Sequence, residues 1–146
     1  MATPTAHTDA QGQNDIDRNV RQYTDLDLFF GRKATSKDIN KVTDIQAVKR
    51  SIRNLVLTNH YEKPFHPEIG SGVMDMLFEP MTPLTAHILT RKIEDVIENF
   101  EPRARLISVR ATPNLDRNEY ECTIEFYVTN TPTELVDLTI FLERLR

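Results

Sequence analysis

Apolar residues recur at helical spacing in two long stretches of the chain. From residue 42 to 61, and again from 83 to 100, apolar side chains fall three or four positions apart, with charged side chains on the other faces. This spacing predicts two long amphipathic helices, each with one face against a core. The apolar stripe of the first helix is Ile45, Val48, Ile52, Leu55 and Val56, and that of the second is Ala86, Leu89, Ile93, Val96, Ile97 and Phe100.

Polar residues at the start of each stretch predict how the two helices begin. Thr43, followed three residues later by Gln46, fits a capping box, in which the two side chains satisfy free backbone N–H groups. Thr82 is the expected N-cap of the second helix. Pro83 suits the first helical position because its missing N–H is not needed there.

Beyond residue 103 the period changes from 3.6 to two, which predicts strands. Three stretches alternate in this way: 107–111, 120–128 and 136–142. The apolar residues expected to face the helices are Ile107, Val109, Ala111, Tyr120, Cys122, Ile124, Phe126, Val128, Val136, Leu138, Ile140 and Leu142. Helices followed by strands predict an α+β fold, with two long helices packed on a three-stranded antiparallel sheet in a single domain from residue 23 to 146.

The segments before and between the helices are less regular. Residues 1–22 hold little apolar bulk, so we expect a flexible arm. Leu26, Leu28 and Phe30 alternate with Asp25, Asp27 and Phe29, which predicts a short half-buried strand or an extended segment. In the connector 62–82, Gly70 and Gly72 are expected at backbone turns, with a turn or two of helix after them.

Composition narrows the classes of function. The net charge of −4 gives no overall case for nucleic-acid binding, and the chain has no apolar run long enough to span a membrane. A single cysteine, Cys122, allows no internal disulfide, which fits folding in a reducing cytoplasm.

Sites for enzyme chemistry are not evident. The four histidines form no HExxH pair, so neither a metal site nor a cofactor is expected. Acidic neighbours such as Glu94 and Asp95 lack the apolar surroundings that would raise a pKa for glycoside hydrolysis. The chain also has no tryptophan on which a sugar could stack. We therefore expect no catalytic residues.

Two features remain that could bind another protein. Pro102 forces a corner after the second helix, and Glu101 and Arg103 flank that corner with opposite charges. These charges could form only a helix stop with a weak surface ion pair, or they could form a docking site. The last strand could likewise be a plain edge, blunted by its terminal charges, or a template for another chain.

Four stretches of the chain together resemble a known family. They are "YTDLDLFF", "VKRSIRNLVLTNHYEKPFHPEIGSGV", "LFEPMTPLTAHILTRKIEDVIENFEPRARL" and "NTPTELVDLTIFLERLR". The sequence resembles the lysozyme-like baseplate wedge proteins of contractile-tailed phages, a family that includes sheath-initiator subunits of type VI secretion systems. The most specific match is the Glu-Pro-Arg triplet at 101–103, and the loop "PFHPEIGSGV" is similar to the family's PFNP…GSG stretch.

The resemblance implies a structural role in the tail baseplate of a virion, with assembly in the host cytoplasm. Glu101, Pro102 and Arg103 would dock on the core bundle of the large wedge subunits. The last strand would accept strands from the tail sheath protein through the segment that contains Glu134, Val136, Leu138, Thr139, Ile140 and Leu142. The tail tube or central hub is a further expected partner. The protein would be a monomer alone and present in several copies, expected to be six, in the baseplate.

Two other functions stay open at this point. A small anti-adaptor of the same superfamily, which inhibits a protease-recruiting protein, would not need a long and regular last strand. A cell-wall muramidase is the third and least supported alternative, because no suitable acid pair is visible.

Overall fold

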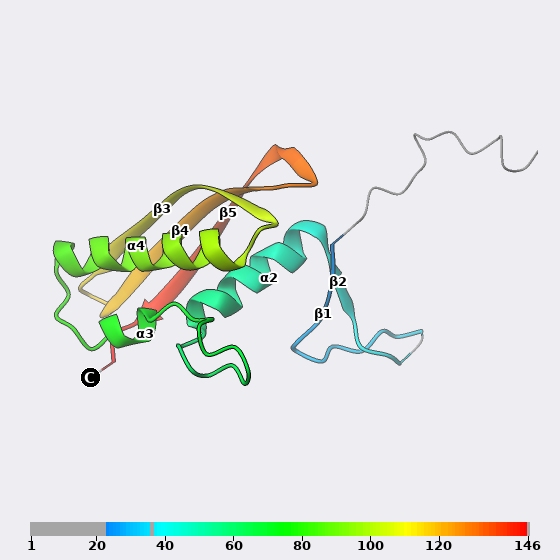
Figure 1. The fold of residues 1–146 in the computed structure, drawn as a ribbon, viewed down its shortest axis with the longest axis horizontal. Coiled ribbons are helices and arrows are strands. Elements are labelled where there is room, and N and C mark those ends of the chain that lie inside the picture. The colour runs from blue at the N-terminus through cyan, green and yellow to red at the C-terminus, as the bar shows by residue number, and fades with distance from the viewer. Residues whose placement is uncertain (1–22, 36, 146) are drawn as a thin grey trace, which may run out of the picture.

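The computed structural model describes residues 23–35 and 37–145, so the predicted arm at 1–22 lies outside the described residues. Figure 1 shows the order of the elements along the chain. They are β1 (Thr24–Leu26), β2 (Lys41–Thr43), α2 (Asp44–Leu57), α3 (Val73–Met76), α4 (Pro83–Phe100), β3 (Ala104–Asn114), β4 (Glu119–Val128) and β5 (Thr131–Glu143). This confirms a mixed fold with a three-stranded antiparallel sheet. The helix α2 has 14 residues, α4 has 18 and α3 has four.

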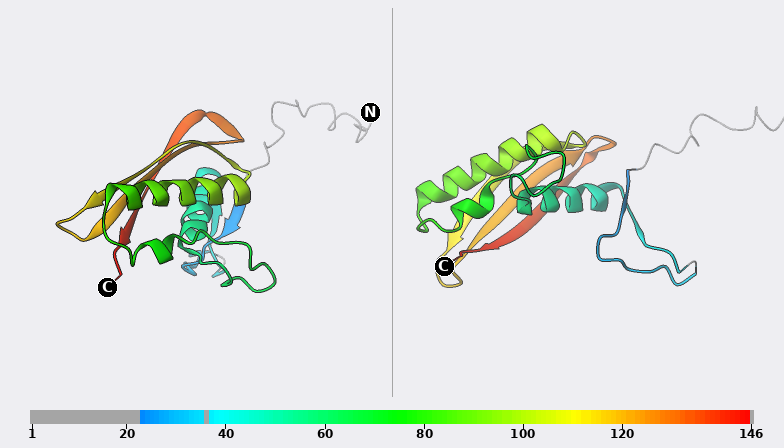
Figure 2. Two further views of the ribbon diagram at one scale, coloured as in Figure 1. Left: turned by 60° about the vertical axis from the view of Figure 1, so that its left-hand side comes forward. Right: turned by 60° about the horizontal axis from the view of Figure 1, so that its bottom comes forward.

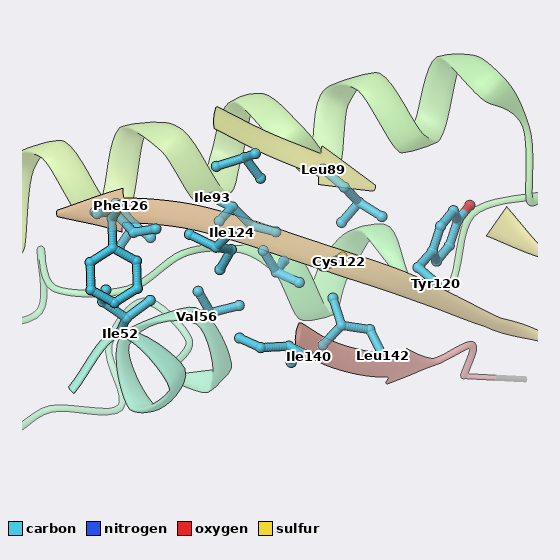
Figure 3. Packing of buried hydrophobic residues seen from close by; sticks show 14 of the residues in the cluster. Ile52, Val56, Leu89, Ile93, Tyr120, Cys122, Ile124, Phe126, Ile140 and Leu142 are labelled. Atoms are coloured by element: carbon cyan, nitrogen blue, oxygen red, sulfur yellow. The ribbon is translucent and has the colours of Figure 1, made fainter. Parts of the chain in front are cut away.

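The helices cover one face of the sheet, whose strand order is β3-β4-β5. The inward side chains of β4, from Tyr120 to Val128, are all fully buried. Figure 3 shows them between α4, on the side of β3, and α2, on the side of β5. The buried side of α4 contains the predicted stripe from Ala86 to Ile97, while Phe100 packs at its margin.

The strand β3 differs from prediction because of a β-bulge. Leu106 pairs with Phe126 and Ser108 pairs with Glu125, so Ile107 is the extra residue. Ile107 is therefore 51% exposed, and Leu106 takes the inward position ahead of Val109. The prediction that Ile107 faces the helices is wrong, because one inserted residue reverses the alternation on either side of it.

The helices α2 and α4 are capped differently at their N-termini. The Thr82 side chain accepts a hydrogen bond from the Thr85 N–H at 3.1 Å, as an N-cap should. Thr43 is the N-cap of α2, but its side chain makes no capping bond, so the predicted capping box is not formed. The Asp44 N–H instead donates to the carbonyl of Tyr23 at 2.7 Å, so the residue before β1 satisfies one donor at this helix end.

The strands β1 and β2 form a separate two-stranded sheet that projects from the body beside α2, as the views in Figures 1 and 2 show. The predicted burial here is inverted. Leu26 and Leu28 are 60% and 62% exposed, whereas Asp27 is 9% exposed. The aspartates of this segment face the protein because arginines lie there, and the leucines consequently face outwards.

The connector between α2 and α4 folds back tightly at its two glycines. A Cβ on Gly70 would lie 2.5 Å from the backbone nitrogen of His60, and Gly72 has a φ of 59°. Both positions therefore favour glycine, the first through close backbone approach and the second through its left-handed conformation. No helix in the described part of the chain is long and apolar enough to cross a membrane.

Candidate docking sites

The corner after α4 is fixed by backbone bonds on both sides of Pro102. The Glu101 N–H still donates to the Ile97 carbonyl at 2.9 Å, and the Ala104 N–H donates to the Glu101 carbonyl at 3.1 Å. The Arg103 carbonyl then accepts from both the N–H and the hydroxyl of Thr129, each at 3.0 Å. The helix therefore passes into β3 through a turn held to the β4–β5 hairpin.

Glu101 and Arg103 form a two-pronged ion pair. Arg103 Nε donates to Glu101 Oε1 at 2.7 Å, and Arg103 Nη2 donates to Oε2 at 3.0 Å. Only 3% of the Glu101 side chain is exposed, against 24% of Arg103. The predicted alternative of a weak surface pair is wrong on this point, because the carboxylate is buried and paired in fork geometry.

The segment before β1 and β1 itself complete the ion-pair network. Arg103 Nη1 donates to the Asp25 carboxylate at 3.1 and 3.3 Å. The guanidinium also lies over the Tyr23 ring, 5.6 Å from its centroid. Arg103 thus joins residues from two ends of the described chain and is held in one orientation by three neighbours.

The electrostatics favour the charged state of this pair. Burial alone would raise the pKa of Glu101, but hydrogen bonds from Arg103 and Ser51, with the arginine charge, lower the pKa below its ordinary value. The hydrogen bonds from Arg103 to Glu101 raise the pKa of the guanidinium against the opposing effect of burial. Both groups are therefore ionised at neutral pH.

The surface that remains at the corner is small. Pro102 is exposed, and a quarter of the Arg103 side chain is accessible beside it. Glu101 is buried beneath them, so it orients Arg103 rather than presenting its own carboxylate to solvent.

The second candidate site is the outer edge of β5. Its register with β4 is continuous from Leu135 to Glu143, which gives an edge about 30 Å long. Val136, Ile140 and Leu142 are buried on the helix side, Leu138 is partly buried, and Thr139 is exposed. A register shift separates Glu134 from this regular part. A hollow of about 350 Å³ lies between Glu134–Asp137 and the start of α2.

The opposite edge is less regular. β3 contains the bulge at Ile107, and Pro113 lacks a backbone N–H. Among the strands of the described chain, β5 therefore offers the longer uninterrupted edge of the main sheet.

Histidine, cysteine and acidic side chains form no metal-binding cluster in the described residues, since no three of them lie close enough there to hold a metal ion. His66 is exposed and its Nδ1 lies 3.1 Å from Glu68 Oε1. Burial raises the pKa of the Cys122 thiol to about 12, so it stays protonated and unreactive.

Asp25 and Asp27 are partners of arginines, a role that was not predicted from the sequence. Asp27 is bound by Arg50 and by the Phe29 N–H, much as Asp25 is bound by Arg103. Their spacing of two residues places both carboxylates on one face of an extended segment, which is the pattern that could have indicated a common buried side.

Comparisons with known proteins match most of this chain to one family. The family described as baseplate wedge protein gp25 matches residues 42–133. The baseplate wedge protein gp25 of Enterobacteria phage T4 is 32% identical over 120 residues, which cover 82% of this chain and 90% of that protein.

Two solved structures share the fold. A protein of Geobacter sulfurreducens, described as a candidate tail lysozyme, has a TM-score of 0.63 and 25% identity over 68% of this chain and 89% of its own. A chain of the anti-feeding prophage baseplate has a TM-score of 0.60 and 19% identity over 86% of this chain and 88% of its own. On the match across most of its length, this chain belongs to the baseplate wedge protein gp25 family.

Proposed function

We propose that this protein is a non-enzymatic subunit of a contractile-tail baseplate that docks on the large wedge subunits and templates the first sheath ring. Membership of the wedge family supports the location in a tail baseplate. Six copies in the baseplate is the expected number, as the resemblance to the family implies. The observation that carries the docking role is the fixed and partly exposed Arg103 beside Pro102.

At the corner, Arg103 is oriented before any partner arrives. Glu101, Asp25 and Tyr23 hold its guanidinium, so docking loses little side-chain entropy. The proposed contact is made by Pro102 and the accessible part of Arg103 against the core bundle of the large wedge subunits. Glu101 contributes as a positioning residue beneath that contact.

At the sheet, the β5 edge suits addition of a sheath strand. Backbone pairing depends little on side chains, so one regular edge can accept equivalent strands from repeated subunits. The buried alternate residues fix the register of β5, while its exposed side chains remain available. A long regular strand of this kind also favours the baseplate role over a small anti-adaptor.

A muramidase is not supported by the buried carboxylates. Glu101 and Asp27 are the buried carboxylates of the described residues. The pKa of Asp27 is lowered chiefly by the Phe29 N–H and also by Arg50, and that of Glu101 is lowered by Arg103. A general acid for glycoside hydrolysis needs a raised pKa, which is the opposite shift.

The docking role is tested by Pro102→Glu. A carboxylate here repels the partner group that Arg103 would bind. The corner is also held by the Ala104 N–H bond to the Glu101 carbonyl and by the Glu101–Arg103 ion pair, so the fold should stay intact. We expect at least a tenfold loss of incorporation into wedges formed with the large subunits, measured by co-purification. Pro80→Glu, at another exposed proline, is the matched control and should assemble normally. Normal assembly of Pro102→Glu would show that the corner is not a docking surface.

A further inference from the structure

A large groove runs along the exposed side of α2. Its volume is about 1220 Å³, which exceeds the usual range of about 300–1,000 Å³ for small-molecule pockets and suits a polypeptide. The α2 helix forms the floor. The segment 25–29 forms one wall, the connector 58–69 forms the other, and Leu138 of β5 lies in the lining.

The wall at 25–29 is unusually apolar for an exposed surface. Leu26, Leu28 and Phe29 are 60%, 62% and 81% exposed. The two leucines face outwards because Asp25 and Asp27, which alternate with them, bind arginines of the protein. Arg50 lies over the Phe29 ring, 5.2 Å from its centroid, and fixes that ring beside the groove. Exposed apolar side chains gathered along one groove indicate an interaction surface.

The floor carries basic side chains that form no ion pair in the described fold. Lys49 and Arg53 lie one helical turn apart, and no carboxylate among the described residues forms an ion pair with either. The acidic groups of the lining are already engaged, since Asp25 binds Arg103 and Glu62 accepts from Asn59. This positive strip occurs in a chain whose net charge is −4.

The backbone of α2 restricts the kind of segment that can bind. The N–H and C=O groups along the side of a helix are paired within it, so the floor offers no backbone partners. A segment lying there must satisfy its own backbone groups, and a helix does so. The exposed floor from Gln46 to Thr58 is about 18 Å long, enough for about three turns of a second helix.

We propose that this groove binds an acidic amphipathic helix of another baseplate protein. Apolar residues of that helix pack against Leu26, Leu28 and Phe29, and its carboxylates meet Lys49 and Arg53. The groove is a third proposed surface, in addition to the contact at Pro102 and the β5 edge. The helix that binds there is recognised by its negative charge and its amphipathic pattern.

Cross-linking in the assembled particle tests the identity of the occupant. A benzophenone amino acid replaces Asn54, an exposed residue of the floor, and a control carries it at Thr112 on the uncovered face of the sheet. We expect position 54, and not 112, to cross-link to a segment of another protein with apolar residues at helical spacing flanked by Asp or Glu. Cross-links to residues 1–22, to a second copy or to a basic segment would overturn the proposal, as would no cross-link at 54.

Charge reversal tests the electrostatic part. Lys49→Glu with Arg53→Glu should reduce incorporation into the baseplate at least tenfold, without lowering the melting temperature, because neither side chain has an ion-pair partner in the described fold. The matched control reverses Arg105 and Arg110, which are exposed on β3 outside the groove. Equal incorporation of both double variants would contradict the proposal.

Discussion

Glu101 is the residue on which the geometry of the corner depends. Its carboxylate is buried at the end of α4 and binds both Arg103 and Ser51. The sequence predicts the corner itself, because a helix cannot continue past a proline at this position. It does not predict the burial of Glu101, since that depends on α2 and on Asp25, 78 residues away from Arg103 in the chain.

Alanine at the two charged positions should have unequal effects on stability. Arg103→Ala leaves a buried carboxylate without its partner and should lower the free energy of unfolding by about 3 kcal/mol. Glu101→Ala should lower it by about 2 kcal/mol, because Arg103 keeps Asp25 and some contact with water. Urea denaturation measures both, with the exposed Arg105→Ala as a control expected within about 0.5 kcal/mol of the unmodified protein. Equal and negligible losses would mean that the pair is not structural.

The pH dependence of stability should report the same carboxylate. The folded-state pKa of Glu101 lies below its ordinary value of 4.5, so its stabilisation is present above that pH. It is lost as the pH falls through the folded-state pKa. The difference in unfolding free energy between the unmodified protein and Glu101→Gln should therefore shrink when the pH is lowered from 7 to 3. A difference that stays constant over this range would assign the stabilisation to another group.

At the scale of elements, burial is predicted correctly where the apolar residues of a helix or strand recur regularly on the face that packs on the core. The stripe of α4 and the inward residues of β4 are buried as predicted, because apolar burial imposes the period directly. The bulge at Ile107 and the inverted face of β1 were not predicted. A bulge depends on the partner strand, and the β1 face is set by ion pairs with arginines far along the chain.

Two helix starts offer a matched comparison. Thr82→Ala removes the bond from the Thr85 N–H and should lower the free energy of unfolding by about 1 kcal/mol. Thr43→Ala removes no capping bond and should lower it by clearly less. Chemical denaturation of both variants measures the difference. A larger loss for Thr43→Ala would contradict the assignment of the caps.

At the scale of the whole molecule, the described fold separates its surfaces. The helices close one face of the sheet (Figure 1). The corner and the α2 groove both contain contacts with the β1 segment, and β5 is an edge strand of the main sheet. This arrangement would let one small subunit contact wedge proteins and sheath at the same time, as proposed. Leu138 belongs both to β5 and to the lining of the α2 groove, whereas Pro102 and Thr139 lie outside that lining.

The structure of an extended baseplate with its first sheath ring, determined by electron cryomicroscopy, tests the central claim most directly. We expect this chain in the baseplate, with a strand from a sheath subunit hydrogen-bonded along β5 between Leu135 and Glu143. Sheath subunits that contact this chain only through side chains, with no strand joined to its sheet, would contradict the account.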